Sequence, residues 1–347
     1  MSSTQPHVVE HPNPDLAWLN KLREEILDPD LPIVDPHHHL WDRSGSRYYL
    51  DELLADLNSG HNIVATVFLQ CFWSYRTEGP EEMRPVGETE FVASVAAEAE
   101  RRKTRQRVCA AIVGHVDFRA GEHVDEVLEA HMAASNGRFR GIRQVAARHP
   151  DLLASISTPP PLGLMSDPAF RAGFARLGKY GLSFDAWLYH TQLGELLDLA
   201  RAFPAIPIVI NHVGGPLVVG PFRGKGDEVF AAWHDGIKQL ATCPNVHMKL
   251  GGLAMAINGF DFHRQVLPPS SGELAHAWWP WMDACIEAFG APRCMFESNF
   301  PVDKAMCSYP VLWNSFKRIA AGASADERGA LFNDTAARFY GIQTSAC

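Results

Sequence analysis

The stretch NIVATVFLQCF, residues 62–72, is almost continuously apolar, and a helical pattern follows it over residues 86–103. A strand that is buried on both faces has this composition, because helices cover both sides of a parallel sheet. Seven further short apolar runs recur along the chain, most of them followed by a helical pattern. They cover residues 33–39, 108–116, 140–145, 182–188, 206–212, 246–250 and 293–299.

Eight strand–helix units in a chain of 347 residues predict the architecture. Strands that alternate with helices form parallel sheets, and eight units favour closure into an α/β TIM (β/α)8 barrel. An open doubly wound sheet would call for a glycine-rich phosphate loop after an early strand, and neither GxGxxG nor a Walker loop occurs. We therefore expect one barrel domain over residues 32–347, with an N-terminal arm over residues 1–31 and a C-terminal helix.

Besides residues 86–103, the sequence predicts helices over residues 15–27, 123–134, 169–180, 192–203, 229–240, 278–289, 311–321 and 324–340. Pro280 is expected near the start of its helix, where a missing N–H costs no hydrogen bond.

Composition excludes several classes of function. The chain is 46% hydrophobic and 20% charged, with a formal net charge of -9, so it lacks the basic surface of a nucleic-acid-binding protein. It has no long apolar span, no signal-peptide pattern at its N-terminus and no CxxC pair among its seven cysteines. We expect a cytoplasmic protein that acts on a small molecule, binds neither nucleic acid nor membrane, and can form homo-oligomers.

Polar residues stand at the carboxyl ends of three of the apolar runs. The active site of a barrel lies at these ends of its strands. His37 and His39 share one face of the first strand by alternation, and His212 ends the sixth run directly before two glycines. Glu297 and Asn299 share one face of the eighth run. Paired imidazoles suit a metal ion, or an oxyanion held by two donors.

Five segments, in this order along the chain, carry a resemblance to a known family. They are VDPHHHLWD (34–42), VINHVGG (209–215), KLGG (249–252), FESNFP (296–301) and NDTAARFY (333–340). The chain resembles the amidohydrolase-related family of the amidohydrolase superfamily, whose TIM-barrel hydrolases work with or without metals. Within it, the sequence is most similar to the branch of sugar-lactone and 2-pyrone-4,6-dicarboxylate lactonases.

The resemblance implies catalytic roles for His37, His39 and His212, and it implies that Arg143 anchors a substrate carboxylate through its planar fork. The family usually has an aspartate at the end of strand eight, and here Asn299 stands in its place. An amide is no general base, although it can orient water or donate to an oxyanion. The catalytic carboxylate is then expected at Glu297, or at Asp303 in the following loop.

The surroundings of these residues leave alternatives open. Glu297 could equally form a buried ion pair with Lys249, which could otherwise bind a substrate carboxylate. Metal-binding relatives have a histidine inside strand five, whereas this chain offers only His190 beyond the strand end, with Asp185 as another candidate ligand, base or substrate contact. Aromatic side chains at strand ends, among them Trp73 and Tyr189, are expected to line the pocket.

The cofactor is expected to be either absent or a single divalent metal, zinc rather than manganese, held by His37, His39 and His212. The leading functional hypothesis is hydrolysis of a lactone or related cyclic ester that carries a carboxylate or hydroxyls, with the histidines polarising the carbonyl. The alternatives are a zinc-dependent decarboxylase or amidohydrolase of the same superfamily, and a barrel that binds a small ligand without catalysis.

Overall fold

The computed structural model describes residues 6–154 and 159–343. Eight parallel strands form one sheet in the order β12-β11-β10-β9-β7-β6-β5-β2. The sheet closes on itself where His39 N donates to Phe300 O at 2.8 Å and Asn299 N donates to His37 O at 2.9 Å. The predicted TIM barrel is therefore confirmed. Its strands are β2 (Pro32–His38), β5 (Asn62–Leu69), β6 (Arg107–Gly114), β7 (Phe139–Ile142), β9 (Ser183–Ala186), β10 (Ile208–Ile210), β11 (Val246–Leu250) and β12 (Cys294–Phe296).

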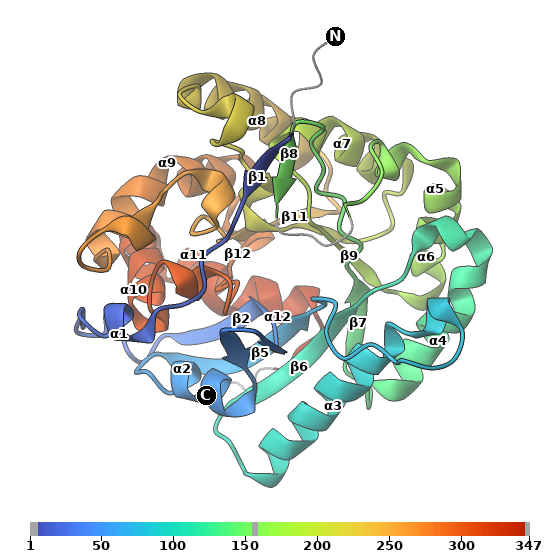
Figure 1. The fold of residues 1–347 in the computed structure, drawn as a ribbon, viewed down its shortest axis with the longest axis horizontal. Helices are drawn as coiled ribbons and strands as arrows, with labels where there is room; N and C mark the ends of the chain where they lie inside the picture. Colours follow the sequence, from blue (N-terminus) through green and yellow to red (C-terminus); the bar gives the residue numbers. More distant parts are fainter. Residues whose placement is uncertain (1–5, 155–158, 344–347) are drawn as a thin grey trace.

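The connecting helices form an outer ring around the strands (Figure 1). Their apolar faces and the outward-facing strand residues make the main core, which includes Trp233, Trp278 and Trp313. A smaller core of branched side chains, among them Val67 and Val209, fills the inside of the barrel. The ring consists of α2 (Leu50–Leu57), α3 (Val86–Arg101), α4 (Val124–Ala134), α5 (Pro168–Ala175), α6 (Leu177–Tyr180), α7 (Leu193–Ala202), α8 (Gly226–Ala241), α9 (Ser271–Phe289) and α10 (Tyr309–Ile319).

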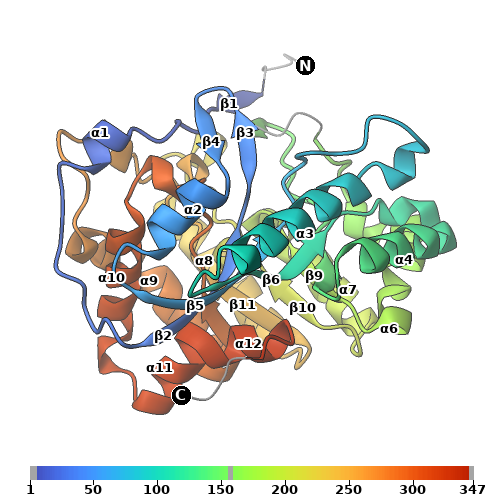
Figure 2. The same cartoon turned by 90° about the horizontal axis from the view of Figure 1, so that it is seen from below.

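The C-terminal segment closes one end of the barrel. It comprises α11 (Ala325–Gly329), a π-helical turn (Ala330–Asp334) and α12 (Thr335–Phe339), and Figure 2 shows α11 and α12 together at this end. Tyr340 belongs to the core inside the barrel, and its hydroxyl donates to Asp185 Oδ1 at 2.9 Å. A substrate must therefore enter from the opposite end.

That opposite end carries a strand of the N-terminal arm and a hairpin (Figure 2). In the arm, β1 (His7–Val9) pairs in parallel with β8 (Leu152–Ala154). The hairpin consists of β3 (Trp41–Arg43) and β4 (Ser46–Tyr48), which pair antiparallel directly after β2. Both elements stand where the carboxyl ends of the barrel strands open, so they form walls of any cavity there.

Seven of the eight predicted strands extend one to three residues too far at their carboxyl ends, and two of these ends carry site residues. The sixth ends at Ile210 rather than His212, and the eighth ends at Phe296 rather than Asn299. The reason is local backbone geometry, since His212 has φ 56° and Asn299 has φ 54°, and a strand cannot continue through the left-handed region.

Three predicted helices are also corrected. The helix with Pro280 begins at Ser271, because Ser270 and Glu273 form a capping box, so Pro280 lies inside it rather than near its start. The helix expected over 15–27 reduces to α1 (Leu16–Leu19), and the one expected over 324–340 is interrupted by the π-helical turn. Among the helices in the described part of the chain, none has the length and apolarity of a membrane span.

Candidate active site

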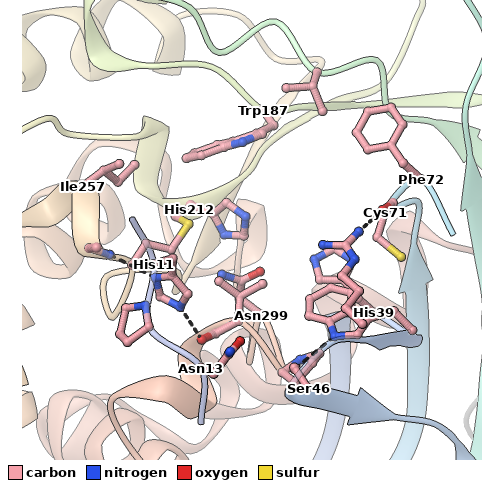
Figure 3. A pocket seen from close by; sticks show the side chains of 18 of the residues that line it. His11, Asn13, His39, Ser46, Cys71, Phe72, Trp187, His212, Ile257 and Asn299 are labelled. Atoms are coloured by element: carbon pink, nitrogen blue, oxygen red, sulfur yellow. Dashed lines mark hydrogen bonds between the residues drawn. The ribbon is translucent and has the colours of Figure 1, made fainter. Parts of the chain in front are cut away.

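A cavity of about 610 Å³ opens at the carboxyl ends of the strands (Figure 3). The arm, the β3–β4 hairpin and the loops after the strands line it. Six of the twelve residues singled out in the sequence line this cavity, namely His39, Trp73, Arg143, Tyr189, His212 and Asn299. The other six lie outside its lining, namely His37, Asp185, His190, Lys249, Glu297 and Asp303.

His212 stands on a tight turn after β10 and is paired with a carboxylate. Its Nδ1 lies 2.7 Å from Glu297 Oε1, and its backbone N–H donates to the same oxygen at 2.9 Å. Because an ionised carboxylate can only accept hydrogen bonds, we assign the ring proton to Nδ1. The other ring nitrogen, Nε2, is then free to act as an acceptor. Burial lowers the pKa of His212, although Glu297 opposes this shift, so the ring is neutral at pH 7.

The two glycines after β11 make room for this pair. A Cβ added at Gly252 would lie 2.4 Å from the ring of His212, and one added at Gly251 would lie 2.4 Å from Glu297 O. Gly252 also has φ 68°, which disfavours any other residue. The KLGG segment therefore positions the His212–Glu297 pair through the absence of side chains.

His37 and His39 lie beside His212, and His38 turns away. The ring centroid of His37 lies 4.9 Å from that of His39 and 4.5 Å from that of His212. His39 Nδ1 bonds to Leu69 O at 2.8 Å, which leaves Nε2 as its acceptor nitrogen. His38 Nε2 contacts Thr66 Oγ1 at 2.9 Å instead. Alternation along β2 thus separates the two cluster histidines from His38 as expected.

Burial lowers the pKa of His37 well below its ordinary value, and the cation of Lys249 adds to this effect. The pKa of His39 is likewise held well below its ordinary value by burial and then by Arg143. Both imidazoles are therefore neutral at pH 7. Arg143 Nη1 donates to His37 Nε2 at 3.1 Å and Nη2 donates to Gln70 O, while its buried Nε has no partner.

Glu297 is wholly buried beneath the histidines. Burial would raise its pKa, but His212 and Lys249 together bring the pKa below its ordinary value, so Glu297 is ionised. The alternative ion pair between Glu297 and Lys249 is wrong. Lys249 Nζ instead lies 2.7 Å from Asp185 Oδ1 and donates to Pro36 O at 2.8 Å. Because Lys249 pairs with Asp185, the carboxylate of Glu297 is available to contact the histidines.

Asn299 and Asp303 form a second pair. Asn299 lines the cavity and its Nδ2 donates to Asp303 Oδ1 at 2.8 Å. Burial raises the pKa of Asp303 well above its ordinary value, which favours its protonated form. Of the two carboxylates that the sequence offered, Glu297 is the one that contacts the histidines.

The residues that could hold a metal differ from the predicted set. His37, His212 and Glu297 offer ligand atoms that all lie within 4.8 Å of one another, whereas His39 is outside this group. Glu297 Oε2 is buried without a hydrogen-bond partner and lies 2.5 Å from His37 Nδ1. Two imidazoles and a carboxylate match a catalytic zinc donor set, so the cluster could bind a divalent metal.

Three predicted site residues serve the structure around the cluster. Asp185 and Lys249 form the buried pair below it, and Asn211 Nδ2 donates to Asp185 Oδ1 at 3.0 Å. His190 lies apart, where its Nδ1 accepts from Leu217 N at 3.2 Å. It is not among the residues that could hold a metal.

Sequence reasoning missed several lining residues. Trp187 stands edge-on to His212, with ring centroids 4.7 Å apart, and alternation from Asp185 could have identified it (Figure 3). His11 and Asn13 of the arm also line the cavity. His11 Nε2 bonds to Val302 O at 2.8 Å. No local sequence pattern predicts that these arm residues line the cavity, because contacts with distant segments hold them in place.

Comparisons with known proteins identify relatives of the chain. A family model described as "Amidohydrolase" matches residues 34–342. The "Uncharacterized protein y4mH" of Sinorhizobium fredii is 34% identical over 335 residues, covering 90% of this chain and 99% of that protein. An "L-fucono-1,5-lactonase" of Burkholderia multivorans is 26% identical, covering 90% and 97%. A solved amidohydrolase structure from Burkholderia multivorans, with bound zinc, has a TM-score of 0.69 at 24% identity, covering 90% and 99%.

Proposed function

The chain belongs to the amidohydrolase family and is a hydrolase, and from this premise we propose that it opens lactones or related cyclic esters of small molecules. The observation that carries the proposal is the pairing of His212, which lines the cavity with Arg143 and Asn299, with the buried carboxylate of Glu297. The lactonase name of the Burkholderia multivorans relative supports the same reaction.

His212 is the proposed general base. Its Nδ1–H bond to Glu297 leaves the acceptor Nε2 to take a proton from water, and the carboxylate stabilises the imidazolium that forms. The resulting hydroxide adds to the carbonyl carbon of the lactone. Collapse of the tetrahedral intermediate breaks the ring C–O bond, and His212 returns the proton to the ring oxygen. The product is the open hydroxy acid.

Negative charge develops on the carbonyl oxygen during this attack. Arg143 lies beside His37 at the histidine end of the cavity, so we assign it to the developing oxyanion rather than to a remote carboxylate. Asn299 donates to Asp303 with one amide hydrogen and can use the other to orient the attacking water. His39 completes the polar wall around the carbonyl.

A divalent metal held by His37, His212 and Glu297 would act as a Lewis acid and lower the pKa of water, so it would replace His212 as the means of activating water rather than assist it. This donor set favours zinc over manganese. The cations of Lys249 and Arg143 oppose metal binding, because they lie 3.4 Å and 3.1 Å from nitrogens of His37. We therefore propose a weakly held metal, which a chelator removes.

A panel of γ- and δ-lactones, followed by proton release at constant pH, tests the proposal. Saturable ring opening of at least one lactone is expected. Release of carbon dioxide from aromatic acids, without opening of any lactone, would instead establish a decarboxylase. Repeating the assay after chelation and readdition of zinc measures the contribution of the metal.

A further inference from the structure

The charged side chains among the described residues that line the cavity are all of one sign. None of the described residues that line it is an aspartate or glutamate, although the chain as a whole carries a net charge of -9. Two arginines line it, Arg143 at the histidine end and Arg43 on the β3–β4 hairpin. Such a cavity attracts an anion and disfavours a cation.

Arg43 is held in place by its neighbours. Its guanidinium carbon lies 4.3 Å from the centroid of the Trp41 ring, which stacks in turn on His39 with centroids 5.5 Å apart. Trp41 Nε1 donates to Ser46 Oγ at 3.1 Å across the hairpin, and Arg43 Nη2 donates to Cys71 O. The stack restricts the plane of the guanidinium, so less side-chain entropy is lost when Arg43 binds a ligand.

The guanidinium of Arg43 belongs to an exposed side chain and has no acidic partner among the described residues. Arg43 forms no ion pair with any carboxylate in the part of the chain that the structure describes, whereas Arg47 on the same hairpin lies 3.5 Å from Glu52. Its neutral acceptor, Cys71 O, uses only one of five N–H donors. A pre-oriented fork without a counter-ion is suited to a carboxylate from outside the protein.

We propose that Arg43 binds a carboxylate of the substrate, so that the enzyme selects anionic lactones over neutral ones. The lactone carbonyl then lies among His39, His212 and Arg143, and the ring spans the cavity to the hairpin. This inference rests on the proposed function, since it names the substrate class of the same site.

The test compares a γ-butyrolactone that carries a carboxylate with the matching carboxamide, which has the same ring and no charge. The wild-type enzyme is expected to prefer the carboxylate in kcat/KM. In Arg43→Gln this preference falls about 10- to 100-fold, because a charge-assisted bidentate contact is lost. Arg43→Lys keeps the charge without the fork and retains part of the preference.

Arg47→Gln is the matched control. It removes the same charge from the same hairpin, but Arg47 does not line the cavity, so the preference stays at the wild-type value. An unchanged preference in Arg43→Gln, or a wild-type enzyme that does not distinguish the two lactones, would overturn the inference. The same holds if Arg47→Gln lowers the preference as much as Arg43→Gln.

A binding measurement separates this inference from the proposed function. Tetrahydrofuran carboxylate has no lactone carbonyl and cannot react, so calorimetry reports its Kd directly. Binding to the wild type that weakens at least tenfold in Arg43→Gln supports the anion site even if no lactone is opened. Failure of the wild type to bind it would overturn the anion site, whatever the lactone panel gives.

Discussion

Glu297→Gln is the substitution that probes the proposed mechanism most selectively. It preserves the shape of the side chain and exchanges one carboxylate oxygen for an amide nitrogen. In the wild type, Glu297 Oε1 accepts from His212 Nδ1 at 2.7 Å and from His212 N at 2.9 Å. In Glu297→Gln the backbone N–H of His212 favours the amide oxygen at the Oε1 position, so the ring keeps its proton on Nδ1. The imidazolium that forms when His212 accepts a proton then lacks the carboxylate that stabilises it.

The expected loss is large. A carboxylate-to-amide exchange behind a catalytic histidine lowers kcat about 10⁴-fold in serine proteases, because the wrong tautomer faces the substrate. Because Glu297→Gln keeps the tautomer and removes only the charge, we expect a smaller loss, of about 10²- to 10³-fold in kcat, with little change in KM. The assay is proton release on the best lactone of the panel, with Tm measured to confirm folding.

Glu88→Gln is the matched control. Glu88 is also a buried carboxylate that accepts two backbone N–H groups, from Cys71 at 2.9 Å and Trp73 at 2.8 Å, and it contacts no histidine of the cluster. Its replacement is expected to lower kcat less than about tenfold. A folded Glu297→Gln enzyme with kcat within tenfold of the wild type would refute the role assigned to Glu297.

Three further predictions concern the supports of the site. Lys249→Met leaves the buried Asp185 without its cation and is expected to destabilise the fold by about 3–5 kcal/mol, measured by denaturant unfolding; a loss below about 1 kcal/mol would contradict this. Burial raises the pKa of Glu88 from 4.5 to about 7, so the folded state keeps this proton to a higher pH than the unfolded chain does. The free energy of unfolding therefore falls as pH rises between these two values. Melting curves should show that Glu88→Gln removes about 3 kcal/mol of this pH dependence, and parallel pH profiles of wild type and variant would disprove the buried acid. Gly252→Ala places a Cβ 2.4 Å from the His212 ring and should lower kcat far more than Gly272→Ala, where the nearest atom lies 3.9 Å away; equal activities would show that the ring moves without consequence.

The barrel was predictable because each strand is an apolar run buried on both faces, and because eight such runs alternate with helices. The histidine pair of β2 was predictable from alternation alone. The strand ends were not predictable, because the turn at His212 depends on the space that Gly252 leaves in the loop after β11. Contacts between distant segments set such details.

The partner of Glu297 was undecided in the sequence for a similar reason. Lys249 lies on β11, next to β12, which precedes Glu297, and two strands away from Asp185 on β9. Inside the barrel its Nζ nevertheless lies 2.7 Å from Asp185 Oδ1. The cavity walls from the arm were missed because β1 pairs with β8, more than a hundred residues away. Local periodicity carries no information about such pairings.

The rate of lactone opening by His212→Asn tests the central claim most directly. Asparagine keeps an N–H near the position of Nδ1, so the bond to Glu297 can persist while the acceptor Nε2 is removed. If His212 is the base, kcat on the preferred lactone falls at least about 10³-fold with Tm little changed. A folded His212→Asn enzyme that opens the lactone within tenfold of the wild-type rate would contradict the account.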